Sequence, residues 1–173
     1  GQKIKLRSFI DKGKAVGKTD HGTAIAAILV GKSLTAESGG LLPGAILYAG
    51  SIFEQRKDGK SRGNLIAFLK ALEWLAVEKV QVVNLSIASP KNEVLQTAVR
   101  AVARTGQVLV AAAGNGGPKA KPFFPAAYTN VIAVTAVDSK LKAYQHANRG
   151  GYIDFSAPGV DLWTASNKGR GRF

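Results

Sequence analysis

Two residues could carry acid–base and oxyanion chemistry, and each stands in a run of small and apolar residues. His21 is followed by Gly-Thr and the apolar residues 24–30, a pattern typical of a side chain at the start of a buried helix. Asn115 lies between glycines after the apolar run 108–113, which predicts a turn at the carboxyl edge of a sheet. A histidine can act as a general base, and a side-chain amide can stabilise the negative charge of a tetrahedral intermediate. The alternatives are a helix cap for His21 and a turn-favouring residue for Asn115.

Four motifs follow one another along the chain. They are the segment around His21, Asn84-Leu85-Ser86-Ile87, residues 110–116 and residues 155–160. Through these motifs, residues 4–163 resemble the subtilisin-like serine peptidases, or subtilases. The resemblance implies a serine endopeptidase that hydrolyses peptide bonds with an Asp-His-Ser triad and an asparagine oxyanion hole. It assigns the general base to His21 and the oxyanion donor to Asn115.

The resemblance also implies two walls of a peptide-binding cleft. The first wall is formed by Ser86, Ile87 and Ala88, whose backbone can pair with an extended peptide as an added strand. The second is formed by Ala113 and Gly114, whose small size leaves room for the residue before the scissile bond. Ala88 stands where the family commonly has glycine, so the cleavage preference does not follow from the resemblance.

Two landmarks of the family are absent from the sequence: the strand with the catalytic aspartate and the Gly-Thr-Ser segment with the nucleophile. The chain order in the family is Asp, His, Ser. We therefore expect residues 1–173 to form a single partial catalytic domain of a longer protein, lacking the Asp strand upstream and the Ser helix downstream. Asp20 should point away from its neighbour His21, Asp11 is too close to His21 in sequence, and Ser156 stands in a strand-end segment. None of the three is assigned to the triad, and we expect the chain alone to be inactive.

Composition restricts the other functional classes. The formal net charge is +13, from 24 basic and 11 acidic residues, which leaves open a basic α/β domain that binds polyanions. Nucleic acid is not expected as the partner, because no aromatic–basic interleaving or known nucleic-acid module accompanies the charge. A catalytically inactive subtilase-like module that binds peptides is the other alternative.

The sequence also limits what the chain can bind and where it is found. There is no cysteine, which excludes disulfides and thiolate metal sites. No apolar run is long enough to span a membrane, and no signal peptide is visible. The chain contains no methionine and begins with Gly1, which agrees with a piece of a longer protein. The resemblance points to export, periplasmic or extracellular. No cofactor is expected, and the calcium sites that some relatives use cannot be read from this sequence.

The element pattern alternates between strands and helices, which predicts an α/β fold with a mainly parallel sheet and helices on both faces, a three-layer arrangement. Helices are expected at residues 20–29, with Asp20 as the cap, at 64–78, and at 94–102, ending near Gly106. Strands are expected at residues 3–10, 45–49, 80–85, 107–113, 130–137 and 152–155. Residues 39–43 and 54–63 are expected to be loops. The apolar strand at 107–113 is expected to be covered on both faces.

Two further expectations concern the backbone. Phe124-Pro125 is a candidate cis peptide, because proline lowers the preference for trans and the pair lies in a specified loop; the resemblance points the same way. In the family, the aspartate strand lies inside the sheet. Its absence would leave a slot of unpaired backbone groups, so we expect self-association through this gap or instability of the chain alone.

Overall fold

The computed structural model describes residues 3–32, 39–166 and 169–172. These residues form two compact units. Unit 1 comprises residues 1–71 and 161–173, and unit 2 comprises residues 72–160. Helix α2 (Leu65–Val77) runs across the boundary in the sequence. Its amino end is capped by Asn64, whose side-chain oxygen accepts the Ala67 N–H at 3.0 Å.

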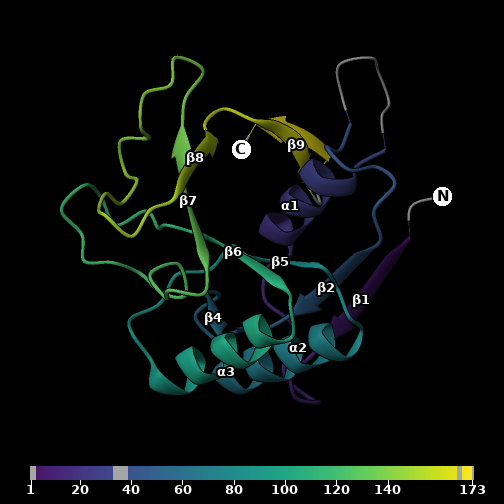
Figure 1. Ribbon diagram of the computed structural model, residues 1–173. Coiled ribbons are helices and arrows are strands. Elements are labelled where there is room, and N and C mark those ends of the chain that lie inside the picture. Colours follow the sequence, from purple (N-terminus) through teal and green to yellow (C-terminus); the bar gives the residue numbers. More distant parts are fainter. Residues whose placement is uncertain (1–2, 33–38, 167–168, 173) are drawn as a thin grey trace. The chain divides into compact units, whose positions relative to one another are not determined.

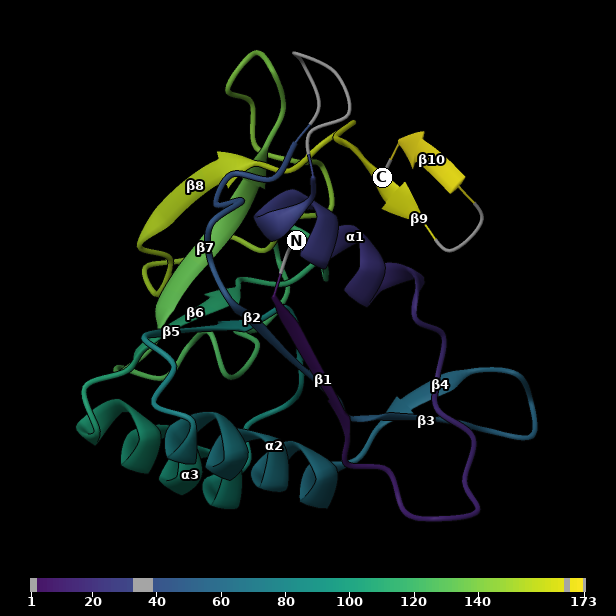
Figure 2. The same cartoon turned by 90° about the vertical axis from the view of Figure 1, so that its right-hand side faces the viewer.

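The described residues of unit 1 include, besides the first part of α2, a parallel pair of strands, a helix and two antiparallel strand pairs. The parallel pair is β1 (Ile4–Ser8) and β2 (Leu47–Ser51), joined in the register Ile4↔Leu47. The helix is α1 (Asp20–Val30). The hairpins are β3 (Phe53–Gln55) with β4 (Ser61–Gly63) and β9 (Trp163–Ser166) with β10 (Gly169–Arg172). Strand β9 packs beside α1 in both views (Figures 1 and 2), and the Thr164 hydroxyl donates to the Ala24 carbonyl at 2.8 Å.

Unit 2 is built on a four-stranded parallel sheet in the order β5-β6-β7-β8 (Figure 1). Its strands are β5 (Val82–Leu85), β6 (Val108–Ala112), β7 (Ile132–Val137) and β8 (Phe155–Pro158). Helix α3 (Glu93–Arg104) connects β5 to β6 and is capped by Asn92, which accepts the Leu95 N–H at 2.9 Å. The core gathers apolar side chains from the helix and the strands: Leu95, Val99, Val102, Leu109, Ala111 and Ala133.

The sequence predicted the class and most elements correctly. The mixed α/β class with a mainly parallel sheet is confirmed, and the three expected helices form within a few residues of their expected bounds. The Phe124-Pro125 peptide is cis, as predicted. None of the helices among the described residues is long and apolar enough to cross a bilayer.

Four expectations need correction. Residues 54–63 are not a loop but belong to the β3–β4 hairpin, whose turn contains Asp58-Gly59 with Gly59 at φ 77°. The last strand of unit 2 begins at Phe155 and not at residue 152. Strands β9 and β10 were not expected. Strand β6 is not covered on both faces along its length. Successive side chains point to opposite faces, and Val108 is 44% exposed while Leu109 is 1% exposed.

Candidate functional site

His21 is the second residue of α1, as predicted, and its side chain is exposed. The helix forms because residues 24–30 are small or apolar, and it ends at Gly31, whose N–H donates to the Ala27 carbonyl. The expected cap is wrong. The capping position is Thr19, which makes no side-chain capping bond, and Asp20 lies inside the first turn. Asp20 Oδ1 is buried without a hydrogen-bond partner among the described residues. Its position in the first turn still places a negative charge near the positive end of the helix dipole.

The chain reaches His21 through residues 11–18, here called the strap, which lies along the β3–β4 hairpin (Figure 2). The Gln55 N–H donates to the Ala15 carbonyl at 2.9 Å, and the Gly17 N–H donates to the Phe53 carbonyl at 2.8 Å. The strap is therefore an added antiparallel segment on β3. Close to its end, the Lys18 N–H donates to Ser61 Oγ at 3.0 Å.

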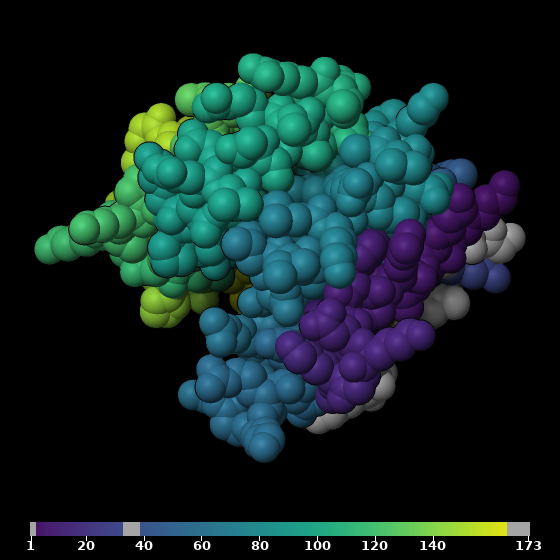
Figure 3. All heavy atoms as spheres, turned by 90° about the horizontal axis from the view of Figure 1, so that it is seen from below, coloured from purple at the N-terminus to yellow at the C-terminus, as the bar shows by residue number. Residues whose placement is uncertain are grey.

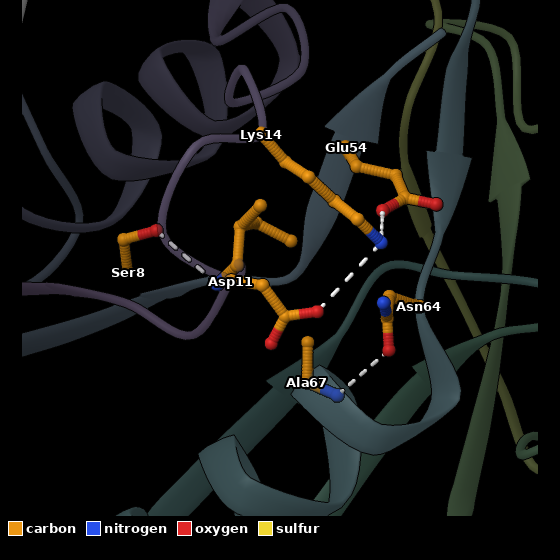
Figure 4. Close-up of polar contacts among 7 residues, drawn as sticks. Ser8, Asp11, Lys14, Glu54, Asn64 and Ala67 are labelled. Atoms are coloured by element: carbon orange, nitrogen blue, oxygen red, sulfur yellow. Dashed lines mark hydrogen bonds and ion pairs between the residues drawn. The ribbon is translucent and has the colours of Figure 1, made fainter.

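An ion pair joins the strap to the hairpin (Figure 4). Lys14 Nζ lies 2.9 Å from a Glu54 carboxylate oxygen and 3.6 Å from one of Asp11. The hydrogen bond from Lys14 lowers the pKa of the Glu54 carboxyl, and the bond to Glu54 raises the pKa of Lys14. Asp11 is thus engaged by Lys14 in an exposed position.

Asn115 lies in the tight turn after β6, and its side chain is exposed. Gly114 and Gly117 have φ values of 108° and 96°, in the left-handed region that favours glycine. A Cβ on Gly114 would also collide with the Phe123 ring. The backbone path therefore requires glycine at positions 114 and 117, and this path places the Asn115 amide beyond the carboxyl end of β6.

Asn148 holds this turn in place, and sequence reasoning missed it. Its side chain is 1% exposed. Its Oδ1 accepts the Gly116 N–H at 2.8 Å, its Nδ2 donates to the Lys121 carbonyl at 3.2 Å, and its backbone N–H donates to the Gly114 carbonyl at 2.9 Å. Nothing in the sequence identifies this role, because an asparagine in a polar stretch is an ordinary loop residue until the fold shows its partners.

The expected cleft walls follow two neighbouring strands of unit 2. Ser86, Ile87 and Ala88 follow β5, and Ala113 and Gly114 follow β6. Strands β5 and β6 are parallel and in direct register, with Leu85 opposite Ala111. All five residues and Asn115 therefore lie at the same carboxyl edge of the sheet.

Local hydrogen bonds fix both walls. In the first wall, Asn84 Nδ2 donates to Ser86 Oγ at 2.9 Å. Beyond this wall, Ser89 and Phe124 exchange two backbone bonds of 2.8 and 2.9 Å. In the second wall, the Tyr152 hydroxyl donates to the Ala113 carbonyl at 2.7 Å.

The other sequence candidates are placed as follows. His21 belongs to unit 1, whereas Asn115 and both walls belong to unit 2. Ser156 lies inside β8, opposite Thr135 of β7, so it is a strand residue as its motif implied. Within the described part of the chain, no group of three or more His, Cys, Asp or Glu side chains is arranged to hold a metal ion.

Comparison with known proteins gives the chain its family. The sequence model of the Subtilase family matches residues 7–172. The thermophilic serine proteinase of Bacillus sp. (strain AK1) is 33% identical over 165 residues, which cover 94% of this chain and 40% of that protein. Subtilisin DY of Bacillus licheniformis is 31% identical over 148 residues, covering 83% of this chain and 53% of that protein.

One further relative and two solved structures are also similar to this chain. The minor extracellular protease Epr of Bacillus subtilis (strain 168) is 32% identical over 82% of this chain and 22% of its own length. The S218A mutant of the PatA protease domain has the same fold, with a TM-score of 0.86, 24% identity, and coverage of 100% of this chain and 66% of that chain. The prenylagaramide maturation protease PagA gives a TM-score of 0.83 at 22% identity, with coverage of 100% and 61%. The chain thus spans about a fifth to a half of the curated relatives named here, and because the family model covers nearly all of it, it belongs to the subtilase family.

Proposed function

We propose that the protein containing this chain is a serine endopeptidase, with His21 as the general base and Asn115 as the oxyanion donor. The observation that carries the proposal is the position of Asn115 at the carboxyl edge of β5 and β6, beside residues 86–88 and 113–114. Ligands of open α/β sheets bind outside this edge. Membership of the subtilase family supports the assignment of the base to His21.

In the proposed reaction, an extended peptide pairs with the backbone of residues 86–88 as an added strand. His21 accepts the proton of a serine hydroxyl as that hydroxyl attacks the scissile carbonyl, and later returns the proton to the leaving amine. Asn115 Nδ2 donates a hydrogen bond to the carbonyl oxygen as negative charge develops on it. We propose that the serine and the carboxylate that orients His21 come from outside residues 1–173.

The test uses the full-length protein with a fluorogenic peptide and a serine-directed phosphonate probe. His21→Ala should lower kcat by about 10³-fold or more and prevent labelling of the serine. Asn115→Leu should lower kcat by about 10²- to 10³-fold with little change in KM, the loss known for the same donor in a subtilisin. Asn130→Leu, an exposed asparagine before β7, is the matched control and should retain activity. Wild-type rates in both site variants would refute the assignment.

A second measurement concerns the chain by itself. Residues 1–173 should neither turn over the peptide nor react with the phosphonate, because a base and one oxyanion donor provide no acyl-enzyme route. Stoichiometric labelling of any serine in residues 1–173 would show that the nucleophile lies within the chain. A full-length protein that binds extended peptides but is never labelled would instead be a peptide-binding relative.

We also propose that the protein is exported, to the periplasm or the extracellular space. One relative is named an extracellular protease, which supports export. Fractionation of cells that express the full-length gene provides the test, and retention of the mature protein in the cytoplasm would contradict export.

A further inference from the structure

We infer that this protein selects acidic polypeptides, with Asp or Glu within a few residues of the cleaved bond and on one side of it. The inference rests on the proposed function and goes beyond it, because it concerns which substrates are favoured. The surface responsible is the basic hairpin patch, defined as Lys12 and Lys18 of the strap with Lys57, Lys60 and Arg62 of the β3–β4 hairpin. In the space-filling view the strap (purple) lies against the hairpin (blue) (Figure 3).

The patch lies close to His21 along the chain and in the fold of unit 1. Lys18 is three residues before His21, which limits their Cα atoms to a separation of about 11 Å. The Lys18 N–H is bound to Ser61 Oγ at 3.0 Å, and Ser61 is next to Arg62 in β4. An extended substrate advances about 3.3 Å per residue. Side chains two to four residues from a bond that reacts at His21 can therefore reach Lys18, the member of the patch nearest to His21 in the sequence.

The charge of this surface is not neutralised by its own carboxylates. Residues 11–18 and 53–63 contain seven basic and three acidic residues. Glu54 and Asp11 are engaged by Lys14, and Asp58 lies 3.9 Å from Arg56. Among the described residues, the four lysines of the patch have no carboxylate partner, and all four are exposed. Arg62 lies opposite Glu54 in the hairpin, so this carboxylate is shared between Arg62 and Lys14.

A peptide fits this surface better than a nucleic acid does. Single-stranded nucleic acids bind where basic side chains alternate with aromatic ones that stack on the bases. The strap has no aromatic residue, and the hairpin has only Phe53, at the far end from its turn. Carboxylates spaced along an extended chain need only the exposed cations. Because such ion pairs are exposed and individually weak, the preference should be modest for each residue and should fall with salt.

The test compares peptides that share one cleavable core and carry Asp, Gln or Lys at each of the four positions on either side of the cleaved bond. For the full-length protein, kcat/KM should be about two- to five-fold higher for each acidic residue on one side of the bond at low salt, and the gain should shrink at high salt. The double variant Lys57→Gln/Lys60→Gln should reduce the ratio of acidic to neutral kcat/KM. Arg100→Gln/Arg104→Gln removes the same charge from α3 and should leave this ratio unchanged.

Four results would overturn the inference. Cleavage with equal kcat/KM for acidic and neutral peptides refutes the selectivity and leaves the proposed endopeptidase function intact. An acidic preference that both double variants weaken equally reflects net charge and not the patch. An oligonucleotide that binds through Lys57 and Lys60 and displaces the acidic peptide at equal concentration makes the surface a polyanion site. Absence of cleavage of every peptide refutes the endopeptidase function itself, and the inference with it.

Discussion

At the scale of single residues, the Asn115 turn shows how the proposed oxyanion donor is positioned by residues to which we assign no chemistry. Gly114 provides the backbone path, and Asn148 supplies hydrogen bonds from a segment far along the chain. The turn that carries Asn115 was predictable from the sequence, because an apolar strand that ends in Gly-Asn-Gly is a local signal. Asn148 was not predictable, since its importance lies in partners that only the fold brings to it.

Replacing Asn148 by alanine should affect both stability and catalysis. The change removes the hydrogen bonds that the buried Asn148 side chain makes to the Gly116 N–H and the Lys121 carbonyl, which should cost about 1–3 kcal/mol of unfolding free energy. If Asn148 positions Asn115, kcat should fall while KM changes little. Asn92→Ala, which removes the cap of α3 and costs about 1 kcal/mol, is the control for destabilisation alone. Urea denaturation measures the stability of both variants, and steady-state kinetics measures their kcat and KM. An equal fall in kcat in both variants would contradict a positioning role for Asn148.

Gly114→Ala should be strongly unfavourable for two independent reasons. The φ of 108° is costly for any residue with a Cβ, and the new methyl group would meet the Phe123 ring. We expect a loss of about 1–3 kcal/mol, measured by urea denaturation. Gly151→Ala is the comparison, because nothing lies within 4 Å of its added Cβ and its φ is not in the left-handed region. A Gly114→Ala protein as stable as the Gly151→Ala protein would show that the turn differs from the one described.

At the scale of elements, the strap and the β3–β4 hairpin define the approach to α1. The helix was predictable, because its first residues and apolar run form a continuous local pattern. The hairpin was not predicted. Its many charged residues are typical of an exposed loop, although Asp58-Gly59 is a common hairpin turn. Its role as a base for the strap depends on backbone bonds such as that from Gly17 to Phe53, which no sequence pattern reports. The start of β8 was also predicted wrongly. Asp154, the residue before β8, accepts the Ala133 N–H of β7 at 2.8 Å, and no sequence pattern reports this contact between neighbouring strands.

The contact between strap and hairpin should depend on pH. The pKa of Glu54 is lowered in the folded protein, so its contribution is present above the ordinary value of 4.5 and is lost as the pH falls through the lowered pKa. The pKa of Lys14 is raised, so its contribution is complete below the ordinary value of 10.5 and is lost as the pH rises through the raised pKa. Hydrogen exchange at the Gly17 amide, corrected for the intrinsic rate, should report the loss of protection at both extremes.

Glu54→Gln supplies the control for this dependence. The glutamine keeps the shape of the side chain and removes its charge, so the loss of protection of the Gly17 amide at low pH should disappear. Asp58→Gln removes a carboxylate from the turn of the same hairpin and should leave the profile unchanged. If the Gly17 amide of Glu54→Gln still loses protection at low pH, another group causes that loss.

At the scale of the whole molecule, the strands fall into separate sheets with unpaired edges. Among the described residues, β2 pairs only with β1, and β5 pairs only with β6. Apolar side chains are exposed on these strands: Val82 is 60% exposed and Leu6 is 73% exposed. An open edge with exposed apolar residues favours pairing with another chain.

We therefore expect residues 1–173 on their own to self-associate. Light scattering should give a mass above that of one chain, increasing with concentration, and thermal unfolding should be broad. Val82→Lys places a charge on the β5 edge and should reduce association, whereas Val94→Lys, at an exposed position of α3, should not. A wild-type chain that is monomeric with a sharp transition at high temperature would contradict this expectation.

The hydrogen bond between Gly116 and Asn148 has a consequence for the order of events during synthesis. Its two partners are 32 residues apart in the chain, and β7 forms between them. Local turns close rapidly, but contacts between distant residues must first overcome the entropy of closing the loop. On the ribosome, the segment around Asn115 emerges well before the residue that fixes it. The Asn115 side chain therefore reaches its final geometry only after β7 has emerged and joined β6. The nascent chain passes through a stage in which this sheet edge exists while the Asn115 turn is not yet fixed.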